Sequence, residues 1–235
     1  MKFATASAFA LLALATIASA PARAESLVVV EARGINLRPG QTVDGTQPLV
    51  LKEGQHVSLI NSAGITFSLD GPYNKPPAAD QSGGAKVTTV LAALVTQNQV
   101  RTGEVGATRG AAPVAKLPSP WVLDVSRPGN VCLREGETPI FWRPSAKQVA
   151  AFAIMPADRS WKSQARWPAG ADRLRATTQA PVHSGATYLV SINDSQVAMT
   201  VNIVPAVLSN NSMRAAWMAQ KGCEAQAEAL LRTRT

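Results

Sequence analysis

Apolar and polar residues alternate with a period of two in several short segments near the N-terminal end of the chain. Val57 and Leu59 follow this period, and Ile65, Phe67 and Leu69 follow it in the next segment. A period of two is typical of a strand with one buried face. Gly, Pro, Asn and Asp gather between the segments, at residues 38–40, 53–54, 61–64 and 70–72. This pattern predicts a short β unit over residues 25–73.

A second set of apolar and β-branched segments recurs at intervals of roughly 8–12 residues, the spacing of an all-β sandwich. These segments are residues 121–125, 130–133, 139–143, 150–155, 188–192 and 197–204. Pro144 and Pro205 each follow one of them and mark strand exits, because proline cannot donate to a ladder. We therefore predict an Ig-like β-sandwich over residues 120–205.

Helical spacing occurs in two places. Apolar residues recur at intervals of three and four over residues 86–100, namely Val87, Val90, Leu91, Leu94 and Val95. They predict a helix inside a linker of residues 74–119 that is otherwise rich in Pro, Gly and small residues. Met213 and Trp217 begin a similar stripe in residues 206–235, where Gly222 kinks a terminal helix or divides it in two. The whole pattern predicts a mainly β fold with a terminal α-helix packed on the sandwich.

Residues 1–24 have the layout of a secretory signal peptide. Lys2 precedes an apolar stretch over residues 3–17, and the segment ends in the A-x-A sequence of residues 22–24. A cut after Ala20 is the alternative site. A membrane anchor is the alternative interpretation, but the apolar stretch is short for a bilayer span of about 20 residues. We therefore expect a periplasmic or secreted protein with residues 1–24 removed.

The net charge and the distribution of charged and apolar residues limit the classes of partner that we expect. The 235 residues carry a formal net charge of +8, but only 16% are charged, against about 25% in typical soluble proteins. The positive charge is spread along the chain, and export also argues against nucleic acid as a partner. An envelope protein, an anionic envelope polymer or lipid head groups fit better, with ordinary surface charge as the alternative. No apolar stretch after the signal is long enough to span a membrane, and the oligomeric state stays open.

The chain contains two cysteines, Cys132 and Cys223. In an exported chain such a pair favours a disulfide, and two buried free thiols are the alternative. The two histidines, His56 and His183, show no ligand spacing to the cysteines, so we predict no metal site. His183 precedes Ser184, but no G-x-S-x-G sequence and no phosphate-binding loop is present. We therefore predict no catalytic residues and no cofactor.

Basic and aromatic residues are interleaved between residues 158 and 175. The candidates for binding are Arg159, Trp161, Lys162, Arg166, Trp167, Arg173 and Arg175. Arginine and tryptophan together bind sugars, phosphates or protein partners by stacking and forked hydrogen bonds. The alternative places Trp161 and Trp167 in the core and leaves the basic side chains solvated.

Residues 48–72, with the sequence PLVLKEGQHVSLINSAGITFSLDGP, resemble the strand pattern of FecR-like periplasmic domains. The resemblance implies a bacterial envelope module that passes signals between proteins. With no catalytic motif in view, we expect an exported binding or scaffold protein that acts through a protein or polymer partner. An envelope hydrolase acting on cell-wall or surface glycan is the alternative, and a cleft with polar groups around His56 or His183 would favour it.

The signal peptide defines the expected start of the mature protein. We predict cleavage between Ala24 and Glu25, because the small residues Ala22 and Ala24 suit the A-x-A cleavage pattern. N-terminal sequencing of the exported protein measures the cut directly. An exported form that still begins at Met1 would contradict this route.

Overall fold

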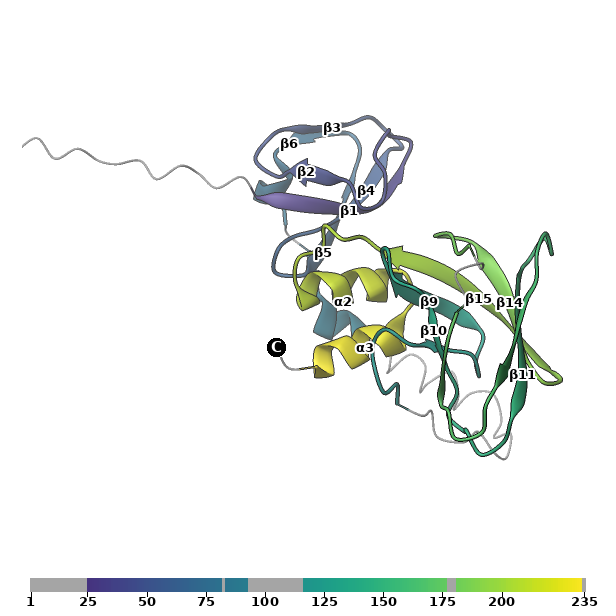
Figure 1. The fold of residues 1–235 in the computed structure, drawn as a ribbon. Helices are drawn as coiled ribbons and strands as arrows, with labels where there is room; N and C mark the ends of the chain where they lie inside the picture. Colours follow the sequence, from purple (N-terminus) through teal and green to yellow (C-terminus); the bar gives the residue numbers. More distant parts are fainter. Residues whose placement is uncertain (1–24, 82, 93–115, 177–180, 234–235) are drawn as a thin grey trace, which may run out of the picture.

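The computed structural model describes residues 25–81, 83–92, 116–176 and 181–233 of the chain. Within these residues the fold is mainly β, as the sequence predicts. An N-terminal β unit and a C-terminal sandwich occupy different ends of the molecule, and two C-terminal helices lie against both of them (Figure 1). The helices therefore form the connection between the two β units.

The N-terminal unit contains one five-stranded sheet in the order β2-β1-β4-β5-β7 and one two-stranded sheet, β3-β6, and all of their pairs are antiparallel. Its elements are β1 (Ser26–Arg33), β2 (Thr42–Asp44), β3 (Leu49–Leu51), β4 (His56–Ile60), β5 (Ile65–Asp70), β6 (Tyr73–Lys75), η1 (Pro77–Ala79) and β7 (Ala85–Lys86). The predicted boundary at residue 73 is wrong, because β6 pairs with β3 and β7 pairs with β5. The unit extends to residue 86, and the predicted linker begins after it.

Residues 27–30 of strand β1 are buried on both faces of the sheet. Leu27 and Val29 point into the core of the N-terminal unit, together with residues of β4 and β5. Val28 and Val30 point the opposite way, toward the C-terminal helices. A strand covered on both faces has no polar side, which explains the unbroken apolar run in the sequence.

The sandwich consists of a five-stranded sheet in the order β12-β11-β14-β15-β9 and a three-stranded sheet in the order β13-β10-β8. Its strands are β8 (Leu123–Asp124), β9 (Gly129–Arg134), β10 (Ile140–Trp142), β11 (Ala150–Pro156), β12 (Ser163–Trp167), β13 (Arg173–Arg175), β14 (Thr187–Ile192) and β15 (Ser195–Val204). Side chains from both sheets meet in one apolar cluster that includes Phe141, Phe152, Trp167 and Tyr188. The two sheets therefore pack face to face, as in an Ig-like sandwich.

Six of these strands coincide with predicted segments, whereas β12 and β13 were not predicted. Both lie in the basic segment between residues 158 and 175, and each ends one of the sheets. Only alternate residues of these edge strands, such as Trp167 and Leu174, contact the core. The sequences of β12 and β13 are therefore largely polar, although their backbones pair with neighbouring strands in regular antiparallel ladders.

Gly222 divides the predicted terminal helix into α2 (Asn211–Gln220) and α3 (Glu224–Arg232). The backbone at Gly222 has a φ of 75°, in the left-handed region that glycine adopts at helix ends. The side chain of Asn210 caps α2 by accepting a hydrogen bond from the backbone nitrogen of Met213. Residues 87–92 are helical, which agrees with the start of the helix predicted over residues 86–100. The remainder of that prediction, and most of the linker after it, falls outside the described residues.

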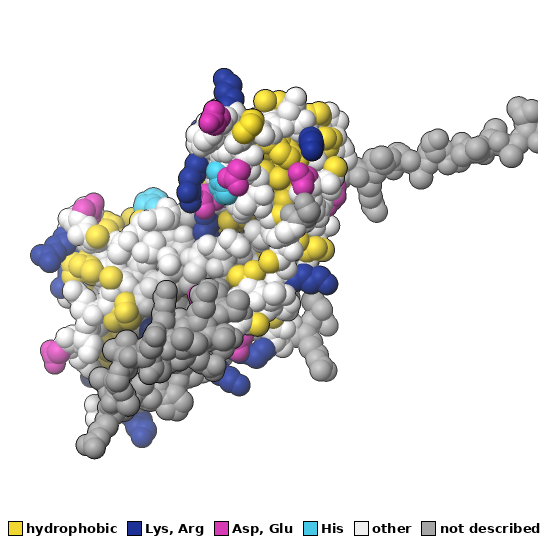
Figure 2. Space-filling view, turned by 180° about the vertical axis from the view of Figure 1, so that it is seen from behind, with side chains coloured by type: hydrophobic (Ala, Val, Ile, Leu, Met, Phe, Trp, Pro, Cys, Tyr) yellow, Lys and Arg dark blue, Asp and Glu magenta, His cyan; other side chains and the backbone are white. Residues whose placement is uncertain are grey.

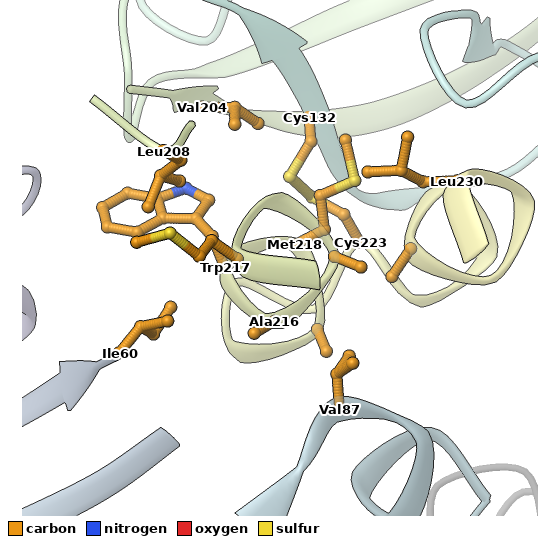
Figure 3. Packing of buried hydrophobic residues seen from close by; sticks show 14 of the residues in the cluster. Ile60, Val87, Cys132, Val204, Leu208, Ala216, Trp217, Met218, Cys223 and Leu230 are labelled. Carbon is orange, nitrogen blue, oxygen red and sulfur yellow. A yellow bond between two sulfur atoms is a disulfide. The ribbon is translucent and has the colours of Figure 1, made fainter. Parts of the chain in front are cut away.

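One apolar cluster, here called the joint core, joins all parts of the fold. It contains Val28, Val30, Ile60, Val87, Leu91, Cys132, Val204, Leu208, Met213, Trp217, Met218, Cys223, Ala227 and Leu230, among others. These residues come from β1, β4, the helix at residues 87–92, β9, β15, α2, α3 and the connections before α2 and α3. Figure 3 shows α2 in the centre of this cluster, with Ile60 on one side and Val204 on the other. The two β units therefore share a core through the helices.

Cys132 of β9 is bonded to the C-terminal helices by its side chain and by its backbone. It forms the predicted disulfide with Cys223, and the two Cα atoms are 5.9 Å apart. The backbone nitrogen of Cys132 donates to Oε1 of Gln226 over 2.6 Å, and its carbonyl accepts from Nε2 over 2.7 Å. The same Nε2 donates to the carbonyls of Pro120 and Val122. Because β9 is an edge strand, the Gln226 amide occupies the place of a further strand.

The N-terminal unit approaches α2 closely at the turn between β4 and β5. A Cβ atom on Gly64 would lie 2.7 Å from the carbonyl oxygen of Ser212, which leaves no room for a side chain. Beside it, Nδ2 of Asn210 donates to the carbonyl of Ser62 over 2.9 Å. The N-terminal unit is therefore positioned on α2 by the close approach of the Gly64 backbone to the Ser212 backbone and by the hydrogen bond to Ser62.

The replacement Gly64→Ala tests this close approach. Gly54→Ala is its matched control, because both glycines have a φ of 76° but a Cβ on Gly54 would meet nothing within 4 Å. We expect Gly64→Ala to lower the free energy of unfolding by a further ~1–3 kcal/mol, the usual cost of overpacking. Urea denaturation measures both losses, and equal losses would show that the turn is not pressed against α2.

The replacement Gln226→Met tests the bonding of the edge strand. It leaves the buried backbone groups of Cys132 without a partner, and each unpaired group costs about 1–3 kcal/mol. Gln220→Met, at an exposed position of α2, is the control and should change stability by less than about 0.5 kcal/mol. Chemical denaturation with the disulfide intact compares them, and similar effects of the two replacements would refute this role for Gln226.

Candidate functional site

The predicted binding residues between positions 158 and 175 do not form one surface. Trp167 is 0% exposed and packs at the centre of the sandwich core, so it offers no face to a ligand. Its ring contacts Phe152 edge to face, and its Nε1 donates to the carbonyl of Ala171. The expectation that Trp167 stacks on a partner is wrong, and the core position is the correct alternative.

The basic residues of this segment lie on opposite faces of the sandwich. Arg166 alternates with the core-facing Ala165 and Trp167, which places it on the outer face of the five-stranded sheet. Arg173 and Arg175 flank the core-facing Leu174 on β13, which belongs to the other sheet. The chain crosses from one sheet to the other between Arg166 and Arg173, and this crossing separates the arginines.

The remaining three predicted residues belong to the connection between β11 and β12. Arg159 and Lys162 are exposed there, and Trp161 is half-buried against Tyr188 with their ring centroids 6.0 Å apart. On the face drawn in Figure 2, the Lys and Arg side chains of the described residues are dispersed and do not gather in one patch. The sequence neighbours are therefore not neighbours on a common binding surface.

A cleft of about 610 Å³ opens at one end of the sandwich. Three connections form it: the residues after β8, the loop from β10 to β11 and the turn from β14 to β15. Its lining residues are Val125, Ser126, Arg143, Pro144, Ser145, Lys147, Gln148, Val149, Ala150, Ile192, Asn193, Asp194, Ser195 and Val197. Loops that a rigid sandwich holds in place are common positions for binding sites.

Arg143 is the distinctive residue of this cleft, because its side chain is charged and the residue is only 6% exposed. Its Nη2 donates to the carbonyl of Pro168 over 2.7 Å, and Nε and Nη2 each lie 3.2 Å from the carbonyl of Ala171. The guanidinium carbon lies 4.8 Å from the ring centroid of Trp167, in a cation–π contact. Packing and hydrogen bonds therefore hold the guanidinium in a defined orientation.

Sequence reasoning missed Arg143 as a site residue, although a signal was present. Phe141 and Arg143 are two residues apart, and Phe141 points into the sandwich core. The period of two thus places a charged residue on the core side at the end of a strand.

A second, shallower cleft of about 620 Å³ lies beside this one, shares Val149 and Ala150 with it, and is lined by Arg166.

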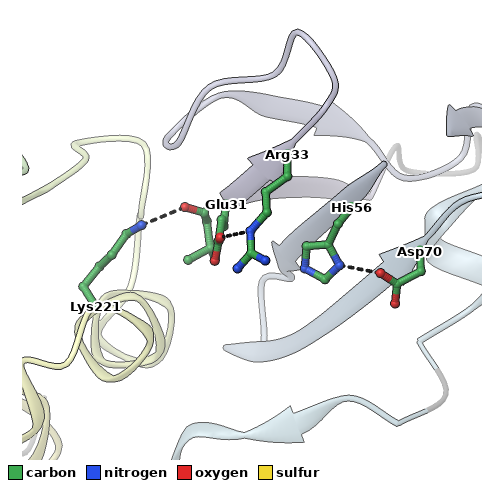
Figure 4. Close-up of polar contacts among 6 residues, drawn as sticks. Glu31, Arg33, His56, Asp70 and Lys221 are labelled. Carbon is green, nitrogen blue, oxygen red and sulfur yellow. Dashed lines mark hydrogen bonds and ion pairs between the residues drawn. The ribbon is translucent and has the colours of Figure 1, made fainter. Parts of the chain in front are cut away.

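The N-terminal unit carries a row of ionisable side chains on the sheet face that turns toward the helices (Figure 4). Here called the ionisable row, it consists of Glu31, Arg33, His56 and Asp70, from β1, β4 and β5. Nε of Arg33 lies 2.6 Å from Glu31, and Nδ1 of His56 lies 2.7 Å from Oδ1 of Asp70. Lys221 lies next to the row, where its Nζ donates to the carbonyl of Val30 over 3.0 Å.

The two histidines differ in their surroundings. The Asp70 carboxylate contacts Nδ1 of His56, and a catalytic general base is often oriented by a carboxylate in this way. Within the described residues, however, no hydrogen bond joins the His56 ring to a hydroxyl group. His183 is exposed, and the neighbouring Ser184 accepts a hydrogen bond at Oγ from the backbone nitrogen of Ile203. The sequence pair His183-Ser184 therefore does not form a base and nucleophile contact.

In residues 25–81, 83–92, 116–176 and 181–233, no three His, Cys, Asp or Glu side chains come together as a metal-binding group. The same residues contain no helix with the length and apolar character needed to cross a membrane. Comparison with models of known protein families and with curated proteins gives no match for this chain. The functional proposal therefore depends on the geometry of the molecule.

Lys221 gives a pH-dependent test of the contact between the helices and the N-terminal unit. Burial lowers the pKa of Lys221 from its usual 10.5, and the charge of Glu31 only partly opposes this. The unfolded chain therefore binds more protons between the lowered pKa and 10.5, so this group makes stability rise with pH across that window. We expect wild-type protein to gain stability relative to Lys221→Met as the pH rises toward 10.5.

Urea denaturation at about pH 8 and about pH 10 measures this gain. Lys75→Met, at an exposed position of β6, supplies the baseline for losing a lysine. An identical pH dependence in wild type and Lys221→Met would contradict burial of the ammonium group at this contact.

Proposed function

We propose that this protein is an exported, non-catalytic binding or scaffold protein of the bacterial envelope that acts through a protein or polymer partner. One observation carries the proposal: two β units share the joint core and are held by a disulfide and by the Gln226 amide. Such a body presents surface loops in a constant arrangement, which suits recognition more than a reaction that needs a moving lid.

The disulfide supports the proposed location. Disulfides form and persist in oxidising compartments such as the periplasm and the extracellular space. The Cys132–Cys223 bond is consistent with the signal peptide expected at residues 1–24. Export to the periplasm or beyond therefore fits both the sequence and the covalent structure.

The proposed partner contacts the end of the sandwich. Two adjoining clefts meet there at Val149, an apolar side chain that is 43% exposed. Lys147 and Arg166 lie on their rims, and neither forms an ion pair within the part of the chain that the structure describes. An apolar centre with basic groups around it suits an acidic protein surface or an anionic polymer.

A role in signal passing, as in FecR-like domains, is a narrower form of this proposal. The resembling residues 48–72 build β3, β4 and β5, and most of their apolar side chains are buried in the two cores. Val50 of β3, in contrast, is 59% exposed. A partner of this segment would therefore contact the β3 side of the N-terminal unit.

Site-specific photo-crosslinking in the native envelope tests the proposal. The photoreactive residue replaces Val149 at the sandwich end, Val50 on β3 or Glu53 in an exposed turn, and Glu53 serves as the control. We expect one discrete adduct from position 149 that excess unlabelled protein abolishes, and none from position 53. The crosslinked species are identified by mass spectrometry.

Two outcomes would contradict the proposal. Adducts that excess protein cannot compete away, or that form equally at position 53, would show non-specific contact. Turnover of cell-wall or surface glycan by the purified protein, lost in His56→Ala, would establish the hydrolase alternative. A competed adduct from position 50 would support the FecR-like form of the proposal.

A further inference from the structure

We propose that the cleft at the end of the sandwich binds a small organic monocarboxylate, with Arg143 as the residue that receives the carboxylate. This inference deepens the proposed function, since it assumes that the protein acts by binding. It is carried by the buried guanidinium of Arg143, the cleft that this residue helps to line, and the charge of the surrounding groups.

The charge of Arg143 is buried without an anionic partner. The residue is 6% exposed, and no carboxylate lies within ion-pair distance of it among the described residues. Burying a charge is costly unless the charge is paired and hydrogen-bonded. The carbonyls of Pro168 and Ala171 supply hydrogen bonds but no negative charge. A carboxylate entering the cleft would supply it.

One part of the guanidinium remains available for that carboxylate. Nε and Nη2 donate to the two carbonyls, whereas Nη1 donates to no other described residue and is not sealed from solvent. The hydrogen bonds and the cation–π contact with Trp167 hold the guanidinium in place before any ligand arrives. A donor that is already oriented binds at a lower entropic cost than a free side chain.

The other groups of the cleft favour a monoanion with an apolar body. Lys147 adds one positive charge and Asp194 one negative charge, so the three charged lining residues leave a net charge of +1. This balance suits a carboxylate better than a dianionic phosphate. The apolar part of the ligand would contact Val125, Val149, Ala150, Ile192 and Val197. A volume of about 610 Å³ lies within the range of small-molecule sites.

A purely structural role for Arg143 predicts a different result from a binding role. The hydrogen bonds to Pro168 and Ala171 attach β10 to the turn after β12 and require only Nε and Nη2. If this attachment were the whole role of Arg143, no anion would bind in the cleft. Binding therefore has to be measured on the folded protein and compared with a neutral ligand of the same shape.

The experiment is a titration of ¹⁵N-labelled, disulfide-intact protein with hexanoate, followed by NMR. Hexanamide is the neutral control with the same apolar body, and inorganic phosphate is the second anion. We expect saturable shifts from hexanoate at residues 125–126, 143–149 and 192–197, and none from hexanamide. Shifts from hexanamide as large as those from hexanoate would show that the cleft binds only the apolar part of the ligand and would overturn the proposal. Saturable shifts from phosphate as large as those from hexanoate would overturn the assignment of a carboxylate ligand.

Two variants connect the shifts to the cleft. Ser145→Trp places a large side chain in the cleft from an exposed lining position and leaves the Arg143 side chain unsubstituted, and it should abolish the hexanoate shifts. Ser68→Trp, at an exposed position of β5, is its control and should leave them unchanged. Arg143→Lys keeps the charge but loses the guanidinium fork, and it should weaken binding by about tenfold or more.

The result can be separated from the test of the proposed function. Loss of hexanoate binding in Ser145→Trp supports the carboxylate site whatever the crosslinking shows. No saturable shift with any of the probes, or shifts that survive Ser145→Trp, would overturn the site. A competed adduct from position 149 would then still support a protein or polymer partner on this surface.

Discussion

The bonding of Cys132 to the C-terminal helices is the interaction on which the rest of the structure depends. Its side chain is bonded to Cys223 and its backbone to the Gln226 amide, so edge strand β9 is attached to α3 by covalent and polar contacts together. A disulfide contributes ~2–4 kcal/mol, mainly by restricting the unfolded chain. The attachment keeps α2 against β1 and β4, whose Val28, Val30 and Ile60 would otherwise face water.

This attachment also explains where the candidate sites lie. The joint core occupies the contact between the two β units, and the cleft at Arg143 is formed by loops at an end of the sandwich. The ionisable row lies beside the contact, where Lys221 donates to the carbonyl of Val30. The cleft is therefore free to bind without disturbing the packing that holds the protein together.

Local patterns in the sequence predicted much of the fold. Alternation at Val57 and Leu59 indicated a strand, and Gly222 marked the break between the two helices. The cysteine count and the expected export together indicated the disulfide. The strand and the helix break depend on residues that are neighbours along the chain. The disulfide involves two cysteines, each of which has one possible partner in the chain. A single sequence can show both kinds of feature.

The candidate site could not be predicted in the same way, because it depends on contacts between distant segments. Arg166 and Arg173 are close in sequence, but the chain changes sheet between them and they point to opposite faces. The period of two marks Arg143 as a charged residue on the core side, but its hydrogen bond to Pro168 and its place in a cleft with the β14–β15 turn depend on distant segments.

Equilibrium unfolding followed by hydrogen exchange tests the central claim that the two β units form one cooperative body. Peptides from β1 and β4 report on the N-terminal unit, and peptides from β11 and β14 report on the sandwich. With the disulfide intact, we predict that both sets lose protection at the same denaturant concentration. Loss of protection in β1 and β4 at a clearly lower concentration, with the sandwich still folded, would contradict a shared core.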